Sequence, residues 1–171
     1  MIITPESLAG IRNDHPAEKI VLLKGTFDLI HPGHVNRMRN AKAFGDLLVV
    51  FVKCDEAIKL KGPDRPIENE DQRAAMVDAI RYVDYTVIAN RKDDAGISDV
   101  PERDRDQYLR YYRMIRDLRP DILIKPEKEL PPVLTELYQS IGTQIRVVPE
   151  TPGISTTMLI RKIRGEKEEA L

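Results

Sequence analysis

Cysteine is almost missing from the sequence, and long apolar runs are missing altogether. Cys54 is the single cysteine among 171 residues, so no disulfide can form within the chain, which suits a reducing compartment. The longest apolar run, Leu47 to Val52, is far shorter than a membrane span. The first ten residues hold no basic stretch followed by an apolar core, so we expect no secretory signal. These absences predict a cytoplasmic protein that does not enter a membrane.

An excess of charge of one sign is also lacking. The 27 Lys and Arg residues nearly balance the 28 Asp and Glu residues, which leaves a formal net charge of −1. A long-range field that would hold nucleic acid or an anionic membrane is therefore not expected. Hydrophobic residues make up 42% and charged residues 32% of the chain, as in ordinary globular proteins. The length predicts a single domain over residues 1–171.

Short apolar runs predict the strands of a parallel sheet. The two clearest runs lack polar alternation, which is typical of strands buried on both faces. Helical patterns separate the runs, so we predict an α/β fold: a Rossmann-like, doubly wound parallel sheet of about five strands. The predicted strands cover residues 20–23, 47–52, 85–88, 122–124 and 145–148.

Capping residues and apolar spacing predict the helices. Thr4 and Pro5 would start a helix within an N-terminal brace over residues 1–18. Asn69 and Gln72 would form a capping pair at the start of another. Further helices are expected over residues 35–44 (stopped by Gly45), 108–118, 134–141 and 155–164, with a surface loop over 91–105 and a frayed tail over 166–171.

The densest group of chemically useful residues runs from Lys24 to His34, after the first long strand. In doubly wound sheets, ligands bind at the carboxyl ends of the strands. Gly33 removes a side chain where a phosphate would meet the N-terminus of the following helix. His31 and His34 would flank that phosphate as hydrogen-bond donors, and the alternative is that they only cap the helix. Metal binding by the pair is a weaker interpretation.

Two further segments predict anion sites. Gly153-Ile-Ser-Thr-Thr157 would open the last helix and present hydroxyl and N–H groups to a second anion. Lys59, Lys61 and Arg65 lie in a loop that also holds glycine and proline. Such a loop could close over a triphosphate and neutralise charge as pyrophosphate departs, although a solvated charged loop is the alternative.

These motifs resemble those of the cytidylyltransferase-like family of nucleotidylyltransferases. Residues 25–34 are similar to the family's HxGH motif, and residues 153–157 are similar to its ISTT motif. Intervening landmarks are Lys61-Gly-Pro-Asp-Arg-Pro66, Arg73 and Ile80-Arg-Tyr-Val-Asp84. Within the family, the chain resembles the heptose-1-phosphate adenylyltransferases and also the glycerol-3-phosphate and ethanolamine-phosphate cytidylyltransferases.

The resemblance implies in-line attack by an acceptor's phosphate on the α-phosphorus of an NTP, with ATP favoured and CTP as the alternative. It implies a homodimer and implies Mg²⁺ carried on the triphosphate, with Asp28 either touching the metal or only stabilising the turn. The implied catalytic residues are His31, His34, Lys24, Lys59 and Lys61. The implied nucleotide-binding residues are Gly25, Thr26, Phe27, Asp28, Gly33, Arg73, Gly153, Ile154, Ser155, Thr156 and Thr157.

Two positions depart from the family's pattern. Relatives tend to carry a glycine-containing turn after the fourth strand, where this chain has Lys125-Pro-Glu-Lys128. Lys125, Lys128 and Arg65 are therefore the candidates for binding the acceptor. The cytidylyltransferases tend to have an arginine three residues before the ISTT glycine, where this chain has Glu150. This departure, the N-terminal brace and the run from Lys61 to Ile67 favour ATP with a sugar 1-phosphate, whereas the altered turn after the fourth strand favours a different or smaller acceptor.

Three other functions fit parts of the sequence. A nucleotide-binding module without turnover would not need His31, His34, Lys59 and Lys61 together. A class I aminoacyl-tRNA synthetase core would need a larger chain and a more basic charge. Arginines at 110, 113, 116 and 119 beside tyrosines could form an RNA-stacking face, but the solvated side of an amphipathic helix explains them more simply.

Overall fold

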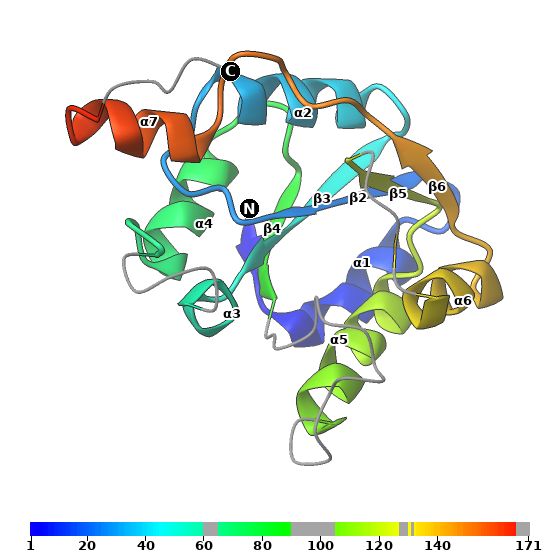
Figure 1. Ribbon diagram of the computed structural model, residues 1–171. Helices are drawn as coiled ribbons and strands as arrows, with labels where there is room; N and C mark the ends of the chain where they lie inside the picture. The colour runs from blue at the N-terminus through cyan, green and yellow to red at the C-terminus, as the bar shows by residue number, and fades with distance from the viewer. Residues whose placement is uncertain (60–64, 90–104, 127–129, 131, 167–171) are drawn as a thin grey trace.

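A computed structural model of the chain describes residues 1–59, 65–89, 105–126, 130 and 132–166. Within these residues, six parallel strands form one sheet in the order β1-β4-β3-β2-β5-β6 (Figure 1). The order turns back between β2 and β5, as expected for a doubly wound sheet. The strands are β1 (Ile2–Ile3), β2 (Ile20–Gly25), β3 (Leu47–Lys53), β4 (Tyr85–Ala89), β5 (Ile122–Lys125) and β6 (Gln144–Val147).

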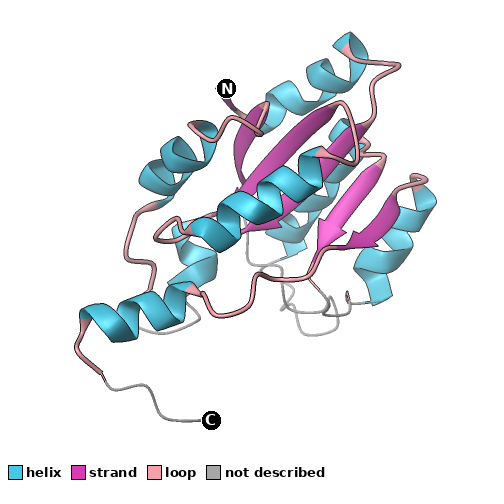
Figure 2. Ribbon diagram, turned by 90° about the horizontal axis from the view of Figure 1, so that it is seen from above, coloured by secondary structure: helices cyan, strands magenta, loops and turns pink. Residues whose placement is uncertain are grey.

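Helices cover both faces of the sheet and bury a separate core on each (Figures 1 and 2). On one face, Met38 of α2 and Val77 of α4 pack on β2 and β3. On the other face, Leu8 of α1, Ile115 of α5 and Tyr138 of α6 pack on the same strands. The helices are η1 (Pro5–Ser7, a 3₁₀ turn), α1 (Leu8–Asp14), α2 (Pro32–Lys42), α3 (Asp55–Lys59), α4 (Glu70–Asp78), α5 (Arg105–Leu118), α6 (Pro132–Ser140) and α7 (Thr156–Ile163).

The α/β architecture is confirmed, and the five predicted strands are all present. The sheet has a sixth strand because β1 pairs with β4 through Ile2 and Ile3, so the predicted N-terminal brace begins with a strand. A run of two residues is too short to show the strand period of two. The short helix α3 was also not predicted.

Local capping is confirmed at the starts of α4 and α7, whereas Thr4 precedes the 3₁₀ turn η1 without a side-chain capping bond, and α2, α5 and α6 start two or three residues before their predicted positions. Asn69 and Gln72 form the predicted capping box: the Asn69 side chain accepts from the Gln72 N–H, and the Gln72 side chain accepts from the Asn69 N–H. The predicted stop at Gly45 is wrong, because α2 ends at Lys42 with Ala43 as its C-cap. Gly45 is needed elsewhere, since a Cβ there would lie 2.5 Å from the backbone oxygen of Lys19.

Several predictions fall outside the described residues. The predicted loop over 91–105 does so except for Arg105, which is the first residue of α5. The predicted tail also does so beyond Glu166, as do the candidate site residues Lys61 and Lys128. Among the described helices, none combines the length and the apolar character needed to cross a membrane.

Candidate active site at the switch point of the sheet

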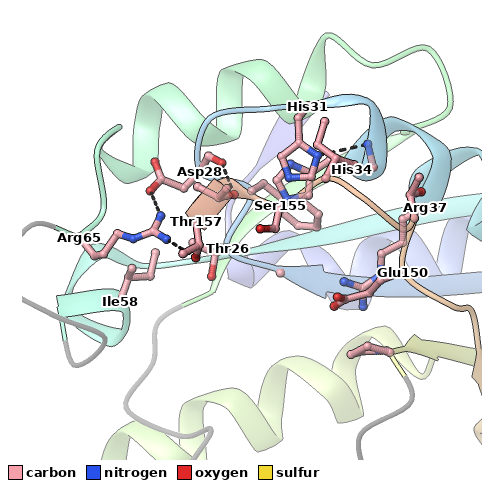
Figure 3. A pocket seen from close by; sticks show the side chains of 17 residues that line it. Thr26, Asp28, His31, His34, Arg37, Ile58, Arg65, Glu150, Ser155 and Thr157 are labelled. Carbon is pink, nitrogen blue, oxygen red and sulfur yellow. Dashed lines mark hydrogen bonds and ion pairs between the residues drawn. The ribbon is translucent and has the colours of Figure 1, made fainter. Parts of the chain in front are cut away.

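A pocket of about 400 Å³ opens at the carboxyl ends of β2, β5 and β6 (Figure 3). This is the edge at which doubly wound sheets bind ligands. The N-termini of α2 and α7 both reach the pocket, so two sets of helix N–H groups face one space. The pocket is lined by Gly25, Thr26, Phe27, Asp28, His31, Gly33, His34, Arg37, Ile58, Arg65, Pro126, Glu150, Thr151, Ile154, Ser155, Thr156 and Thr157.

His31 is the N-cap of α2, and its ring has one nitrogen already committed. Its Nδ1 atom accepts the Gly33 N–H at 3.2 Å. In a neutral ring the hydrogen is then on Nε2, which makes Nε2 a donor. Gly33 permits this geometry, because a Cβ there would lie 2.9 Å from Cε1 of His31. His31 therefore both caps the helix and offers a donor to a ligand.

His34 stacks on His31, with ring centroids 3.8 Å apart, and the edge of Phe27 packs against it at 5.5 Å. Burial lowers the pKa of His34 to about 4, and the positive charges of His31 and Arg37 act in the same direction. Burial also lowers the pKa of His31. Both rings are therefore neutral at pH 7, so they act as hydrogen-bond donors rather than as fixed cations.

The N-terminus of α7 is tied to the opposite wall of the pocket. Ser155 is the N-cap, and its hydroxyl accepts the Met158 N–H at 3.2 Å. The Thr156 hydroxyl donates to the backbone oxygen of Asp28 at 2.9 Å. Arg65 donates to the Thr157 hydroxyl at 3.1 Å. Only one of the three hydroxyls caps the helix, and the other two join α7 to neighbouring loops.

Asp28 lies inside the protein and stabilises the turn after β2. Its carboxylate accepts from the N–H groups of Ile67 and Glu68 at 3.0–3.2 Å and from Arg65 at 3.1 Å. These bonds already occupy both oxygens. The described residues also include no group of three His, Cys, Asp or Glu side chains arranged for a metal ion. Of the two roles considered for Asp28, the geometry fits stabilisation of the turn and does not fit Mg²⁺ binding.

Arg73 was predicted to contact the nucleotide, but its side chain is 0% exposed. Its guanidinium donates to the backbone oxygens of Thr26 at 2.6 Å and Glu68 at 2.9 Å, and to the carboxylate of Asp55 at 2.7 Å. The Glu68 carboxylate in turn accepts the Leu29 N–H at 2.9 Å. Arg73 thus holds the loops around the pocket, and the predicted direct contact is replaced by a positioning role.

The turn after β2 contains two residues in the left-handed region, Phe27 at φ 54° and Leu29 at φ 47°. Each costs roughly 1–2 kcal/mol relative to an ordinary conformation. The conformation of Phe27 lays its ring over Gly25, where a Cβ would lie 2.7 Å from Cζ. Gly25 is therefore required by this close approach of the ring.

The predicted lysines are placed less centrally than the histidines. Lys24 donates to the Tyr111 hydroxyl at 2.8 Å and is not among the residues that line the pocket. Lys59 is the exposed last residue of α3, and Lys125 is the last residue of β5, just before the pocket-lining Pro126. Arg65 reaches the pocket directly. The catalytic roles of Lys24 and Lys59 and the acceptor role of Lys125 stay predictions.

Sequence reasoning missed two charged residues in the pocket wall. Arg37 lies three residues after His34 on α2, a spacing that puts both on one face of a helix. That spacing was the available signal for Arg37. Glu150 was considered only as a departure from a family pattern, and β6 brings it into the same pocket as Arg37.

Comparison with known proteins agrees with this geometry. A family model described as cytidylyltransferase-like matches residues 22–162. The chain is 32% identical over 169 residues to the bifunctional protein HldE of Haemophilus ducreyi, a match that covers 96% of this chain and 32% of that protein. It is 36% identical over 150 residues to the HldE protein of Gluconobacter oxydans, which covers 86% and 28%. The chain spans about a third of the length of these curated relatives.

Two solved structures share the fold. One is the lipopolysaccharide core biosynthesis protein of Thermoplasma volcanium (TM-score 0.58, 21% identity, 79% of this chain and 98% of that one). The other is the pantoate-β-alanine ligase of Francisella tularensis, complexed with β-γ ATP and β-alanine (TM-score 0.53, 18% identity, 99% and 80%). The family match covers most of the chain and includes both helix starts at the pocket. The chain belongs to the cytidylyltransferase-like family.

Proposed function

We propose that the chain is a nucleotidylyltransferase, which transfers the nucleoside monophosphate of an NTP to the phosphate of a sugar phosphate. One observation carries the proposal: the N-termini of α2 and α7 converge on one pocket with a neutral histidine pair and Arg65. Helix N-termini attract phosphate groups through their N–H donors. The relatives named HldE and the family model support the same reaction class.

The reaction needs positioning and charge stabilisation more than proton transfer. An oxygen of the acceptor phosphate forms a bond to the α-phosphorus, and the bond from that phosphorus to the bridging oxygen breaks. Pyrophosphate leaves with the electron pair. Because the attacking oxygen is already anionic, no general base is required. His31 and His34 would donate to the triphosphate as charge develops on the leaving oxygen, and Ser155 and the N–H groups of α7 would hold the terminal phosphates.

ATP is the preferred donor in this proposal, and CTP is the alternative. The matches to HldE proteins favour the adenylyl branch of the resemblance. Mg²⁺ would arrive with the triphosphate and keep most of its waters, as it usually does in nucleotide sites. We further propose that the protein is cytoplasmic and that it forms a homodimer. Size-exclusion chromatography with light scattering would test the homodimer.

The experiment is to incubate the protein with each NTP, Mg²⁺ and a panel of sugar phosphates and alcohol phosphates, and to measure pyrophosphate release. A sugar 1-phosphate with ATP is expected to give the highest rate. If none of the acceptors in the panel gives pyrophosphate release with any NTP, the assignment to a phosphorylated acceptor is contradicted. Binding of NTP without any turnover would favour a nucleotide-binding module.

A further inference from the structure

The two ends of the pocket differ in the charges they carry. At one end, the residues around α7 offer donors: the helix N–H groups, Ser155 and the Arg65 guanidinium. The Asp28 carboxylate at this end is buried and already accepts from Arg65 and from two backbone N–H groups. Such an end suits a triphosphate. At the other end, Arg37 and Glu150 line the wall together (Figure 3). A carboxylate there would repel a phosphate, so this end is not built for a second polyanion.

Arg37 has hydrogen-bonding capacity to spare. It lies on α2, one turn beyond His34, and its half-buried side chain lines the pocket. Within the described part of the chain, its Nε atom is buried and has no hydrogen-bond partner. Burial lowers the pKa of Arg37, and the charge of Glu150 acts in the opposite direction. A buried donor left unsatisfied is costly, so a ligand that accepts from Arg37 would gain affinity.

Glu150 supplies the complementary group. It follows β6, it is solvent-exposed, and as a carboxylate it only accepts hydrogen bonds. The pair therefore presents a donor beside an acceptor. The edge of an amino-substituted base has the matching pattern: an exocyclic amine that donates, next to a ring nitrogen that accepts. Ribose hydroxyls both donate and accept, so they would not require the two opposite charges.

We propose that Arg37 and Glu150 select the base of the NTP. Glu150 accepts from the exocyclic amine of adenine or cytosine, and Arg37 donates to the adjacent ring nitrogen. Hypoxanthine and uracil present the inverse pattern, with a carbonyl oxygen in place of the amine, and that oxygen would face the Glu150 carboxylate. The inference rests on the proposed function, because it takes an NTP as the occupant of the pocket.

Binding without acceptor tests the inference separately from turnover. Calorimetric titration with ATP, ITP, CTP and UTP, each with Mg²⁺, gives two matched pairs, in each of which the exocyclic amine is replaced by a carbonyl and the adjacent ring nitrogen changes from acceptor to donor. We expect the wild type to bind at least one amino nucleotide about tenfold more tightly than its oxo counterpart, which equals about 1.4 kcal/mol. Glu150→Gln should bring that ratio close to one, because an amide can present either its oxygen or its NH₂ group. Arg37→Ala should weaken binding of the preferred nucleotide about tenfold.

Matched controls are Glu136→Gln, an exposed glutamate on α6, and Arg39→Ala, an exposed arginine on α2; both should bind as the wild type does. Ratios near one in the wild type, or ratios unchanged in Glu150→Gln, would overturn the inference. So would an equal gain in affinity for all four nucleotides in Glu150→Gln, which would mark this end as a phosphate site. Selective binding of amino nucleotides without pyrophosphate release would contradict the proposed function alone. Pyrophosphate release without that selectivity would contradict the inference alone. No binding of any nucleotide would contradict both.

Discussion

At the scale of single residues, the histidine pair carries the clearest consequences. His31→Ala and His34→Ala should each lower kcat by about a hundredfold or more, the usual loss when one preorganised donor to developing charge is removed. Pyrophosphate release at saturating NTP and acceptor measures the effect. His15→Ala is the matched control, because His15 contacts Glu18 and Tyr85 and does not line the pocket. A kcat close to wild type in both pocket variants would remove the histidines from the mechanism.

The lowered pKa of His34 also makes stability depend on pH. In the unfolded chain the ring titrates near 6.5, whereas in the folded protein its pKa is about 4. Between these values the unfolded state binds more protons, so the free energy of unfolding falls as the pH falls from about 6.5 towards 4. In His34→Asn this contribution is lost, so its melting temperature should fall less steeply between pH 7 and 5 than that of the wild type. If the melting temperatures of the two proteins fall equally between pH 7 and 5, the argument that burial lowers the pKa of His34 is contradicted.

At the scale of elements, two substitutions at the N-cap of α7 distinguish a capping role of Ser155 from a role in catalysis. Ser155→Ala removes the N-cap and should cost about 1 kcal/mol of stability, whereas Ser155→Gly should cost only a few tenths. If the hydroxyl binds phosphate as proposed, both variants lose kcat/KM for the NTP to a similar degree, although their melting temperatures differ. The measurements are thermal unfolding and initial rates on the same two proteins. Wild-type kcat/KM in Ser155→Gly would limit Ser155 to capping.

Elements that depend on local signals could be predicted, and those that depend on tertiary contact could not. The Asn69 capping box and the Ser155 cap each depend on residues within four positions of one another, so the sequence alone predicts both. The role of Gly45 depends on the backbone of Lys19, which only the fold brings close. For the same reason Arg73 was assigned to the ligand: its residue type shows the charge but not the burial.

The candidate site follows the same division. Gly25 to His34 and Gly153 to Thr157 are continuous segments, and both contribute residues to the pocket, although Gly153 itself does not line it; their contacts with a ligand stay predictions. Arg37 and Glu150 come from different elements, and no local pattern connects them. They come together because the strand order places β6 near β2, so that the carboxyl end of β6 and the first turns of α2 face the same pocket.

At the scale of the whole molecule, the pocket draws its walls from both halves of the sheet, so donor choice tests the assembled site. At equal ATP and CTP with a sugar 1-phosphate acceptor, we expect the labelled adenylyl product to predominate. The two products can be separated by ion-exchange chromatography. A preference for CTP of tenfold or more, about 1.4 kcal/mol in transition-state binding, would contradict the adenylyl assignment and leave the reaction class intact. Tighter binding of both ATP and CTP than of ITP and UTP, as the inference about Arg37 and Glu150 allows, is compatible with either outcome of this competition.

The position of β2 within the sheet has a mechanical consequence. β2 pairs with β3 on one side and β5 on the other, and four of its six residues are buried. β6 pairs with β5 on one side at the edge of the described sheet, and its side chains are mostly exposed. Less free energy therefore resists local opening at β6 than at β2. The pocket therefore joins two walls of unequal resistance to opening: the wall after β2, which carries the histidines, and the wall after β6, which carries Glu150.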